Sequence, residues 1–442
     1  MTAPAVPGKL LRVLGAGFGL AVIVGAVIGV GILRTPGEVA RHAGNVWLIL
    51  GLWLAGGIYA LVAAASVTEL GTMLPEAGGY FIFSRRAFGD AVGFTVGWTD
   101  WIGQCSVIAY ASIALGEFFT ALVPQLTGRE SWIGISVILL FGALQTTGIR
   151  TSSSVQQITS LIKAIAFLAL VVACFWKGGG VPITAAAAPV RTEPLLVAMV
   201  LAFASVVLTY DGWYEALYFT EEIRDPARDL PRSMIGGVAL VIVIYMLVNA
   251  ALVYVLPLNE LAASKLPAAD AAQRLFGASS SRLIVALSLI SLPPLINAVM
   301  LCASRILYAM SRASLLPARL GGVSDRGTPE WALLASLILA SALAATGTFR
   351  ELIAVASFIF VVNHCFAFVA MFVLRRREPG LARPFRVWGY PWATAVVLIA
   401  AVGFLGGSLV SDRKHSLYAL GLIAVSFPLY ALMRRARLNA VN

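Results

Sequence analysis

The sequence is poor in charged residues and in cysteine. Only 12% of its 442 residues are charged and 60% are hydrophobic, which is far more apolar than a soluble domain. Its four cysteines fall inside apolar runs and lack metal-ligand spacing, which argues against a disulfide framework or a zinc site. The composition therefore predicts a polytopic membrane protein, and we expect neither a cofactor nor a metal.

Sequence motifs of several functional classes are also missing. The chain has no His-Glu-x-x-His or Gly-x-Ser-x-Gly sequence, which a membrane-embedded enzyme would need, and no Walker-type Gly-x-x-x-x-Gly-Lys-Ser/Thr sequence. It also has no repeat that resembles a selectivity filter. These absences disfavour an enzyme, an ATP-driven pump and a channel, and leave a secondary carrier as the preferred class.

Long apolar runs account for most of the chain. The first run continues into the first span without a cleavage site, so no removable signal peptide is expected. We expect one transmembrane domain over residues 1–442. A window of about 20 residues predicts twelve spans, near residues 10–40, 45–72, 91–123, 131–149, 152–176, 194–222, 233–256, 283–311, 330–347, 351–374, 390–410 and 415–434.

The basic residues indicate the orientation of these spans. The net charge is +11, but Lys and Arg lie in short loops between apolar runs, so no nucleic-acid partner is expected. An even number of spans puts both termini on one side, and the loops of that side carry the larger share of Lys and Arg, most clearly Arg375, Arg376 and Arg377. We therefore expect both termini in the cytoplasm and the chain in the inner (cytoplasmic) membrane, surrounded by lipid.

The first span contains a glycine-rich stretch, Gly25–Leu33, near the middle of the membrane. Glycine costs about 1 kcal/mol relative to alanine in a helix interior, and non-helical backbone at that depth requires a surrounding of protein or a water-filled cavity. One interpretation is therefore a broken helix beside a cavity. The alternative is close helix packing, because Gly15 and Gly19, and then Gly25 and Gly29, have the spacing of membrane-packing glycines.

The sixth span carries a similar interruption at Thr209–Trp213, where an acid and a glycine separate two apolar pieces too short to cross alone. Spans one and six occupy corresponding positions in two five-helix halves, residues 10–176 and 194–374, and enter the membrane from opposite sides. Paired interruptions of this kind indicate an inverted repeat with the substrate site between its halves. The alternative, an ordinary loop between two spans, would change the helix parity. The helices at 390–434 are additional to the repeats.

Several short motifs follow one another along about residues 10–390. They are Gly29-Val30-Gly31-Ile32-Leu33, Glu69-Leu70-Gly71, Pro75-Glu76-Ala77-Gly78-Gly79-Tyr80, Tyr210-Asp211-Gly212-Trp213, Thr220-Glu221-Glu222, Ser304-Arg305 and Arg383-Pro384-Phe385-Arg386. With this order and spacing the chain resembles the amino acid, polyamine and organocation (APC) transporter superfamily, most closely the prokaryotic type of its L-amino-acid transporter (LAT) branch. The resemblance implies an all-α LeuT-type fold of 12 transmembrane helices, with a 5+5 inverted repeat, discontinuous helices 1 and 6, and two extra helices. It also implies transport of L-amino acids by alternating access.

The interruptions also suggest how a substrate would bind. An α-amino acid presents a carboxylate and an ammonium on one carbon, and a broken helix offers free N–H groups and free carbonyls. We expect N–H groups of the first break to bind the carboxylate, and carbonyls near Ala26 and Val27 and around Leu208–Asp211 to bind the ammonium. The candidate substrate-binding residues are Ala26, Val27, Gly29, Val30, Gly31, Ile32, Leu208, Thr209, Tyr210, Asp211 and Trp213, with Gln104 and Ser291 from spans three and eight.

Two of these residues depart from the branch that the chain resembles. Leu208 stands where that branch commonly has a bulky aromatic gate, and Asp211 stands where it often has a small residue. An intramembrane carboxylate is a functional candidate. Asp211 either caps nearby N–H groups or contacts the substrate, and in the second case it would be the counter-charge of a cationic amino acid or a polyamine.

Lys163 lies near the centre of span five, where an unpaired ammonium costs several kcal/mol. The ends of the span are about 18 Å away, beyond the reach of snorkelling. Gln156 and Lys163 match the span-five pattern of the resembling branch, in which the lysine bridges to the broken first helix in place of a coupling cation. We therefore expect transport to be sodium-independent. A structural lysine favours exchange or uniport, whereas reversible proton release would give proton symport.

The loop after span three bears on partners. Animal members of the resembling branch pair with a single-span glycoprotein through a cysteine in that loop. Residues 124–130 contain no cysteine, so we expect no disulfide-linked heavy-chain partner.

Overall fold

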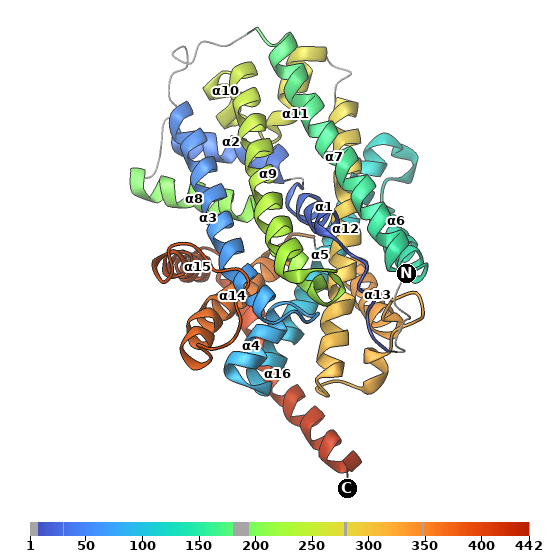
Figure 1. Cartoon of the computed structure of the whole chain (residues 1–442). Coiled ribbons are helices and arrows are strands. Elements are labelled where there is room, and N and C mark those ends of the chain that lie inside the picture. The colour runs from blue at the N-terminus through green and yellow to red at the C-terminus, as the bar shows by residue number, and fades with distance from the viewer. Residues whose placement is uncertain (1–7, 30, 180–193, 278–280, 347–348, 442) are drawn as a thin grey trace.

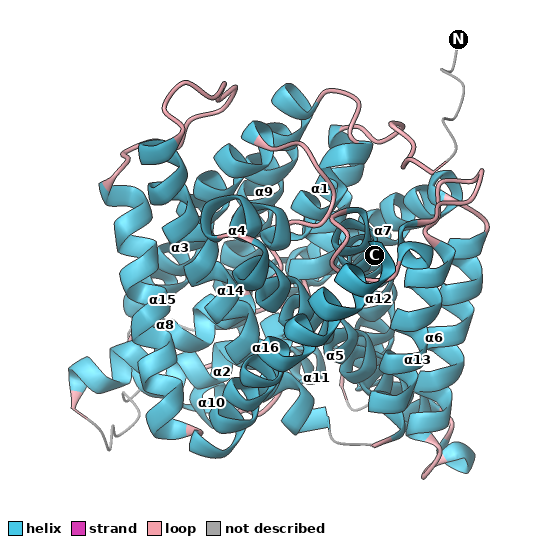
Figure 2. Cartoon of the chain, turned by 90° about the horizontal axis from the view of Figure 1, so that it is seen from below, coloured by secondary structure: helices cyan, strands magenta, loops and turns pink. Residues whose placement is uncertain are grey.

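The structure is a computed structural model that describes residues 8–29, 31–179, 194–277, 281–346 and 349–441. Within these ranges the regular elements are packed helices, together with one isolated backbone bridge between Leu14 and Ile223 (Figures 1 and 2). The α-helices are α1 (Ala16–Val27), α2 (Gly31–Ala43), α3 (Val46–Met73), α4 (Tyr80–Phe88), α5 (Asp90–Leu122), α6 (Glu130–Thr146), α7 (Ile149–Lys177), α8 (Leu195–Thr209), α9 (Pro226–Val255), α10 (Leu258–Ala263), α11 (Pro267–Phe276), α12 (Ser281–Arg312), α13 (Glu330–Ala345), α14 (Phe349–Arg377), α15 (Trp392–Ser411) and α16 (Arg413–Val441). The 3-10 helices are η1 (Pro124–Leu126), η2 (Glu215–Glu222) and η4 (Ala318–Gly321).

Most of the long helices are apolar enough to cross a membrane. In the described part of the chain, eight single helices have the required length and hydropathy, namely α3, α5, α7, α9, α12, α14, α15 and α16. α1 and α2 meet the same requirement as one bent pair, while α6, α8 and α13 are apolar but shorter. The predicted all-α membrane protein is thereby confirmed, whereas the number of twelve crossings and the repeat remain predictions.

Two features differ from the predicted spans. The second part of the sixth span is the 3-10 helix η2 rather than an α-helix, and it follows a turn at Gly212, whose φ of 101° lies in a region that other residues rarely adopt. In addition, α4, α10 and α11 occupy segments that were expected to be loops. A hydropathy window sized to the bilayer is longer than any of these three helices, so it does not detect them.

Two of the glycines in the first span set the distance between helices. A Cβ atom on Gly19 would overlap Ser233 of α9, and one on Gly25 would overlap Gln156 of α7. The helix-packing interpretation is therefore correct for these two positions. It does not extend to Gly29, where a Cβ atom would have no neighbour nearer than 4.0 Å.

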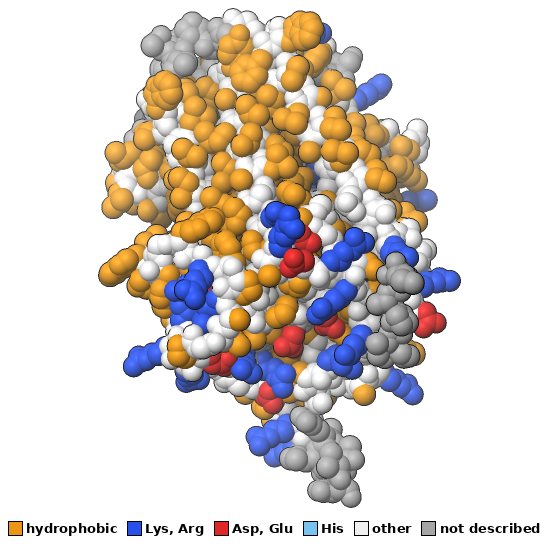
Figure 3. Space-filling view, viewed as in Figure 1, with side chains coloured by type: hydrophobic (Ala, Val, Ile, Leu, Met, Phe, Trp, Pro, Cys, Tyr) orange, Lys and Arg blue, Asp and Glu red, His pale blue; other side chains and the backbone are white. Residues whose placement is uncertain are grey.

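Two buried glutamates pair with arginines of helices that are distant in sequence. Glu69 of α3 accepts hydrogen bonds from Arg375 of α14 at 2.6 and 2.8 Å, and Glu222 of η2 accepts from Arg305 of α12 at 2.9 and 3.0 Å. Figure 3 shows charged side chains gathered on the lower half of one face, around α4 and near the C-terminus, while the upper half is largely hydrophobic. That asymmetry gives the molecule an apolar surface suited to lipid.

Candidate functional site

The first interruption of the sequence is a bend between α1 and α2. α1 ends at Val27, α2 begins at Gly31, and the two helices are inclined by 52°. Val30 lies outside the described residues. Gly29 and Gly31 line a cavity. The end of α1 therefore presents carbonyls, and the start of α2 presents N–H groups, near one cavity.

One face of α7 holds the C-terminal end of α1. Lys163 is fully buried, and its Nζ donates to the carbonyls of Gly25 at 2.7 Å and Ile28 at 2.6 Å. Two other α7 side chains, spaced for the same helix face, donate to a single carbonyl of α1: Ser160 at 2.7 Å and Gln156 at 3.3 Å, both to Ala21 O. The lysine thus satisfies two carbonyls that the break in the helix leaves without intrahelical partners.

Tyr245 of α9 connects the two interruptions. Its hydroxyl lies 2.8 Å from Val27 O at the end of α1 and 3.1 Å from Thr209 O at the end of α8. The side chain of Thr209 in turn donates to Thr35 Oγ1 of α2 at 2.9 Å. The hydroxyl of Tyr245 therefore bridges the ends of the two broken helices.

We expect Tyr245→Phe to lower both transport and stability, because the variant leaves two helix-end carbonyls without their shared donor. An unsatisfied buried polar group costs about 1–3 kcal/mol, which thermal unfolding in detergent would detect. The matched control is Tyr254→Phe on the same helix, where the ring packs on Phe175 away from both breaks. Equal melting temperatures for the two variants would contradict the bridging role.

The second interruption follows α8. The chain turns after Thr209, and Gly212 approaches the first break so closely that a Cβ atom there would lie 3.2 Å from the carbonyl carbon of Ala26. The side chain of Asp211 is 26% exposed, and its Oδ1 lies 3.9 Å from His364 Nε2 of α14. Only glycine fits both the positive φ at position 212 and the close approach to Ala26. The backbones of the two breaks are therefore in direct contact.

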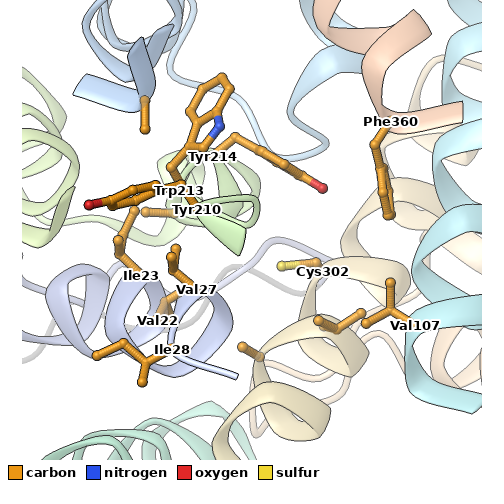
Figure 4. Packing of buried hydrophobic residues seen from close by; sticks show 14 of the residues in the cluster. Val22, Ile23, Val27, Ile28, Val107, Tyr210, Trp213, Tyr214, Cys302 and Phe360 are labelled. Carbon is orange, nitrogen blue, oxygen red and sulfur yellow. The ribbon is translucent and has the colours of Figure 1, made fainter. Parts of the chain in front are cut away.

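A cavity of about 420 Å³ lies between the two breaks and helices α5, α12 and α14. Figure 4 shows Tyr214 extending from the second break toward Phe360 of α14, with Val27 and Cys302 nearby. The lining includes seven of the residues proposed from the sequence: Ala26, Val27, Gly29, Gly31, Leu208, Thr209 and Asp211. This volume is within the usual range of small-molecule sites.

Other proposed residues are buried near the cavity without lining it. They are Ile32, Tyr210, Trp213, Gln104 and Ser291. The hydroxyl of Tyr210 donates to Trp53 O at 3.1 Å, and that of Ser291 donates to Leu287 O in its own helix at 2.7 Å. These two side chains are thus used in helix packing.

The structure also places residues in the lining that sequence reasoning missed. They include Glu38, Val107, Tyr110, Tyr214, Glu215, Leu292, Leu295, Val299, Ser357 and Phe360. Glu215 had a detectable signal, because it is an acid four residues after Asp211 within a span. No sequence signal marked the apolar lining residues of α5, α12 and α14, because any face of these apolar helices could have been turned toward the cavity.

A second and larger cavity, of about 1280 Å³, lies at the opposite end of η2. Its basic lining residues are Lys9, Arg12, Arg85, Arg150, Arg224 and Arg312. The two cavities share no lining residue, and η2 contributes Glu215 to the smaller and Glu221 to the larger. Leu14 N donates to Glu222 O at 3.0 Å, so the N-terminal segment is fastened to the same end of η2. η2 therefore separates the two cavities.

Comparisons with known proteins identify related amino acid transporters. Residues 20–427 match the family model described as amino acid permease. The chain is 28% identical over 437 residues to the serine/threonine exchanger SteT of Bacillus subtilis, covering 97% of this chain and 98% of that protein. It is 28% identical over 382 residues to large neutral amino acids transporter small subunit 2 of Homo sapiens (83% and 70% covered), and 28% identical over 408 residues to b(0,+)-type amino acid transporter 1 of Mus musculus (90% and 82%). The chain therefore belongs to the amino acid permease family of the APC superfamily, in its LAT-like branch, and is a membrane transporter rather than an enzyme.

Proposed function

We propose that this protein is a secondary transporter that moves L-amino acids across the cytoplasmic membrane by alternating access. The observation that carries the proposal is the pair of broken helices facing one cavity. The N–H groups at the start of α2 would bind the substrate carboxylate, and the carbonyls at the ends of α1 and α8 would bind its ammonium. No charged side chain is needed for this part of the substrate.

The two breaks also support the LeuT-type repeat. Under this proposal the single domain of residues 1–442 contains repeats at 10–176 and 194–374, and α15 and α16 are additional. The smaller cavity is bounded by both breaks, as expected for a site between two inverted halves. The separation of the two cavities by η2 fits a state that is closed toward the basic end, which we assign to the cytoplasm together with both termini.

Lys163 supports sodium-independent transport. Its ammonium lies between the carbonyls of Gly25 and Ile28, so a fixed positive charge already occupies the position between α7 and the broken helix that a coupling cation would use. We favour exchange or uniport over proton symport because the lysine holds two carbonyls that would lose their donor each time it released a proton. The loop that begins at η1 contains no cysteine, so no disulfide-linked heavy chain is proposed.

We expect exchange to continue unchanged when sodium is replaced by choline. The test is counterflow in proteoliposomes that are preloaded with a mixture of amino acids and given radiolabelled amino acids outside. Initial rates with sodium, with choline, and with choline plus an inward proton gradient separate the coupling modes. Strict dependence on sodium would overturn the cation-surrogate role of Lys163, and uptake without a preloaded substrate would favour uniport over exchange.

A further inference from the structure

The smaller cavity is acidic. Asp211, Glu215 and Glu38 belong to its lining, and among the described lining residues none is lysine or arginine. Lys163 does not balance these charges, because its Nζ donates to backbone carbonyls of α1. The binding of a zwitterion to backbone N–H groups and carbonyls does not account for three carboxylates beside one cavity.

Glu215 differs from the other buried glutamates of the described chain. Glu69 and Glu222 are fully buried, and each accepts two hydrogen bonds from an arginine within 3.0 Å. Glu215 is 3% exposed, yet the partners of its carboxylate are both uncharged: the amide Nε2 of Gln104, at 3.3 and 3.5 Å, and the thiol of Cys302. A buried carboxylate without a cation is strongly destabilised unless a partner or a proton arrives. Of the three buried glutamates Glu69, Glu215 and Glu222, Glu215 is the one that lines the smaller cavity.

Gln104 provides an independent sign that a partner is missing. Its side chain is fully buried and directed at Glu215, and its Oε1 has no hydrogen-bond partner. Buried polar atoms are normally satisfied, so an acceptor without a partner, beside a carboxylate without a cation, indicates a place for a donor. Because Gln104 donates to Glu215, it positions the carboxylate rather than neutralising it.

We propose that Glu215, positioned by Gln104, is a subsite for the side-chain ammonium of a cationic L-amino acid. This inference rests on the proposed amino acid transport and names its substrate class. Asp211 lies in the second break itself, next to the carbonyls assigned to the α-ammonium, whereas Glu215 lies four residues further along the turn and η2. Residues 211–214 form a turn and η2 begins at Glu215, so the carboxylate of Glu215 belongs to a different element from the carbonyls at the break.

The walls of the cavity suit such a side chain. The lining of the smaller cavity includes apolar side chains from three helices, namely Val107 of α5, Leu295 and Val299 of α12 and Phe360 of α14. An aliphatic stem packs against these groups while its terminal ammonium reaches the carboxylate. A diamino acid fits better than a polyamine, because a polyamine has no carboxylate to bind the N–H groups at the start of α2.

The experiment compares L-lysine and L-ornithine with L-leucine and L-alanine in counterflow by wild-type protein and by Glu215→Gln. We expect wild-type protein to exchange the cationic substrates. We expect Glu215→Gln to raise their half-saturation concentration about 30-fold, equivalent to about 2 kcal/mol at 1.4 kcal/mol per tenfold. Any effect on the neutral substrates should be much smaller. Glu117→Gln is the matched control, because Glu117 is exposed on α5 outside the cavity.

Each of the other possible results of this experiment tests the Glu215 subsite or the proposed transport function. Neutral exchange by wild-type protein without cationic exchange overturns the subsite and leaves the proposed transport function intact. If neutral exchange alone is found and Glu215→Gln alters only its pH profile, Glu215 binds a proton and the subsite is again overturned. No exchange of any amino acid by folded wild-type protein overturns both proposals. Should Glu215→Gln fold poorly, Glu215→Asp keeps the charge and must retain stabilisation by L-lysine in a thermal-shift assay, or the subsite is wrong.

Discussion

Lys163→Met is expected to abolish amino acid exchange and to destabilise the folded protein. Methionine keeps most of the apolar stem but removes the ammonium, so the carbonyls of Gly25 and Ile28 lose the donor that lies 2.7 and 2.6 Å away. Each unsatisfied carbonyl costs about 1–3 kcal/mol, and the loss falls at the helix break that is assigned to the substrate. Counterflow in proteoliposomes and thermal unfolding in detergent would measure the two effects.

The matched control is Lys177→Met at the exposed end of the same helix, where the lysine lies over the ring of Phe276. It should leave exchange nearly unchanged. Wild-type rates in Lys163→Met would contradict the role of the lysine at the break. Accumulation driven by a proton gradient in wild-type protein, together with exchange by Lys163→Met that no longer responds to the gradient, would instead assign proton coupling to this residue.

Gly31→Val is expected to abolish uptake while the protein still reaches the membrane in normal amounts. A Cβ atom at position 31 would lie 3.2 Å from Thr209 Cγ2, and the branched side chain would enter the cavity where α2 presents its N–H groups. Thr209 also bonds to Thr35 and accepts from Tyr245, so it cannot move aside without disturbing both breaks. Uptake assays normalised to surface expression would measure the loss.

Gly51→Val provides the control for placing valine at a helical glycine, because a Cβ atom on Gly51 of α3 would meet nothing within 4 Å. The control thus introduces the same side chain into a helix where it meets no neighbouring group. A Gly31→Val variant with wild-type substrate affinity would show that the carboxylate does not bind at the start of α2.

The amino-acid sequence by itself determined the class of protein and the places where its helices fail. Composition and apolar runs were enough to predict an all-helical membrane protein, because the bilayer imposes one length and one polarity on every span. The interruptions at Gly25–Leu33 and Thr209–Trp213 were readable because glycine and an acid at mid-membrane oppose the local preference for helix. The structure has α1 ending at Val27 and α8 ending at Thr209.

Only the tertiary structure decided which side chains meet at those interruptions. Tyr245 lies 218 residues from Val27 in sequence and 36 from Thr209, yet one hydroxyl reaches both. Glu215 is recognisable in the sequence as an acid within a span, but only the turn at Gly212 and the 3-10 geometry of η2 bring it to the cavity. The same geometry buries Trp213, which sequence reasoning had assigned to the pocket.

The sequence predicts the helices but not the contacts between them, because helix formation depends on local interactions and the contacts depend on long-range packing. Helix formation and membrane insertion depend on propensity and hydropathy summed over neighbouring residues, so they can be read along the chain. Which face of a uniformly apolar helix turns toward a cavity depends on packing against other helices, and in this chain small residues such as Gly19 and Gly25 set that packing. Hydropathy is nearly the same around such a helix, so the sequence cannot distinguish Val107 at the cavity from Leu139 on the exposed surface of α6.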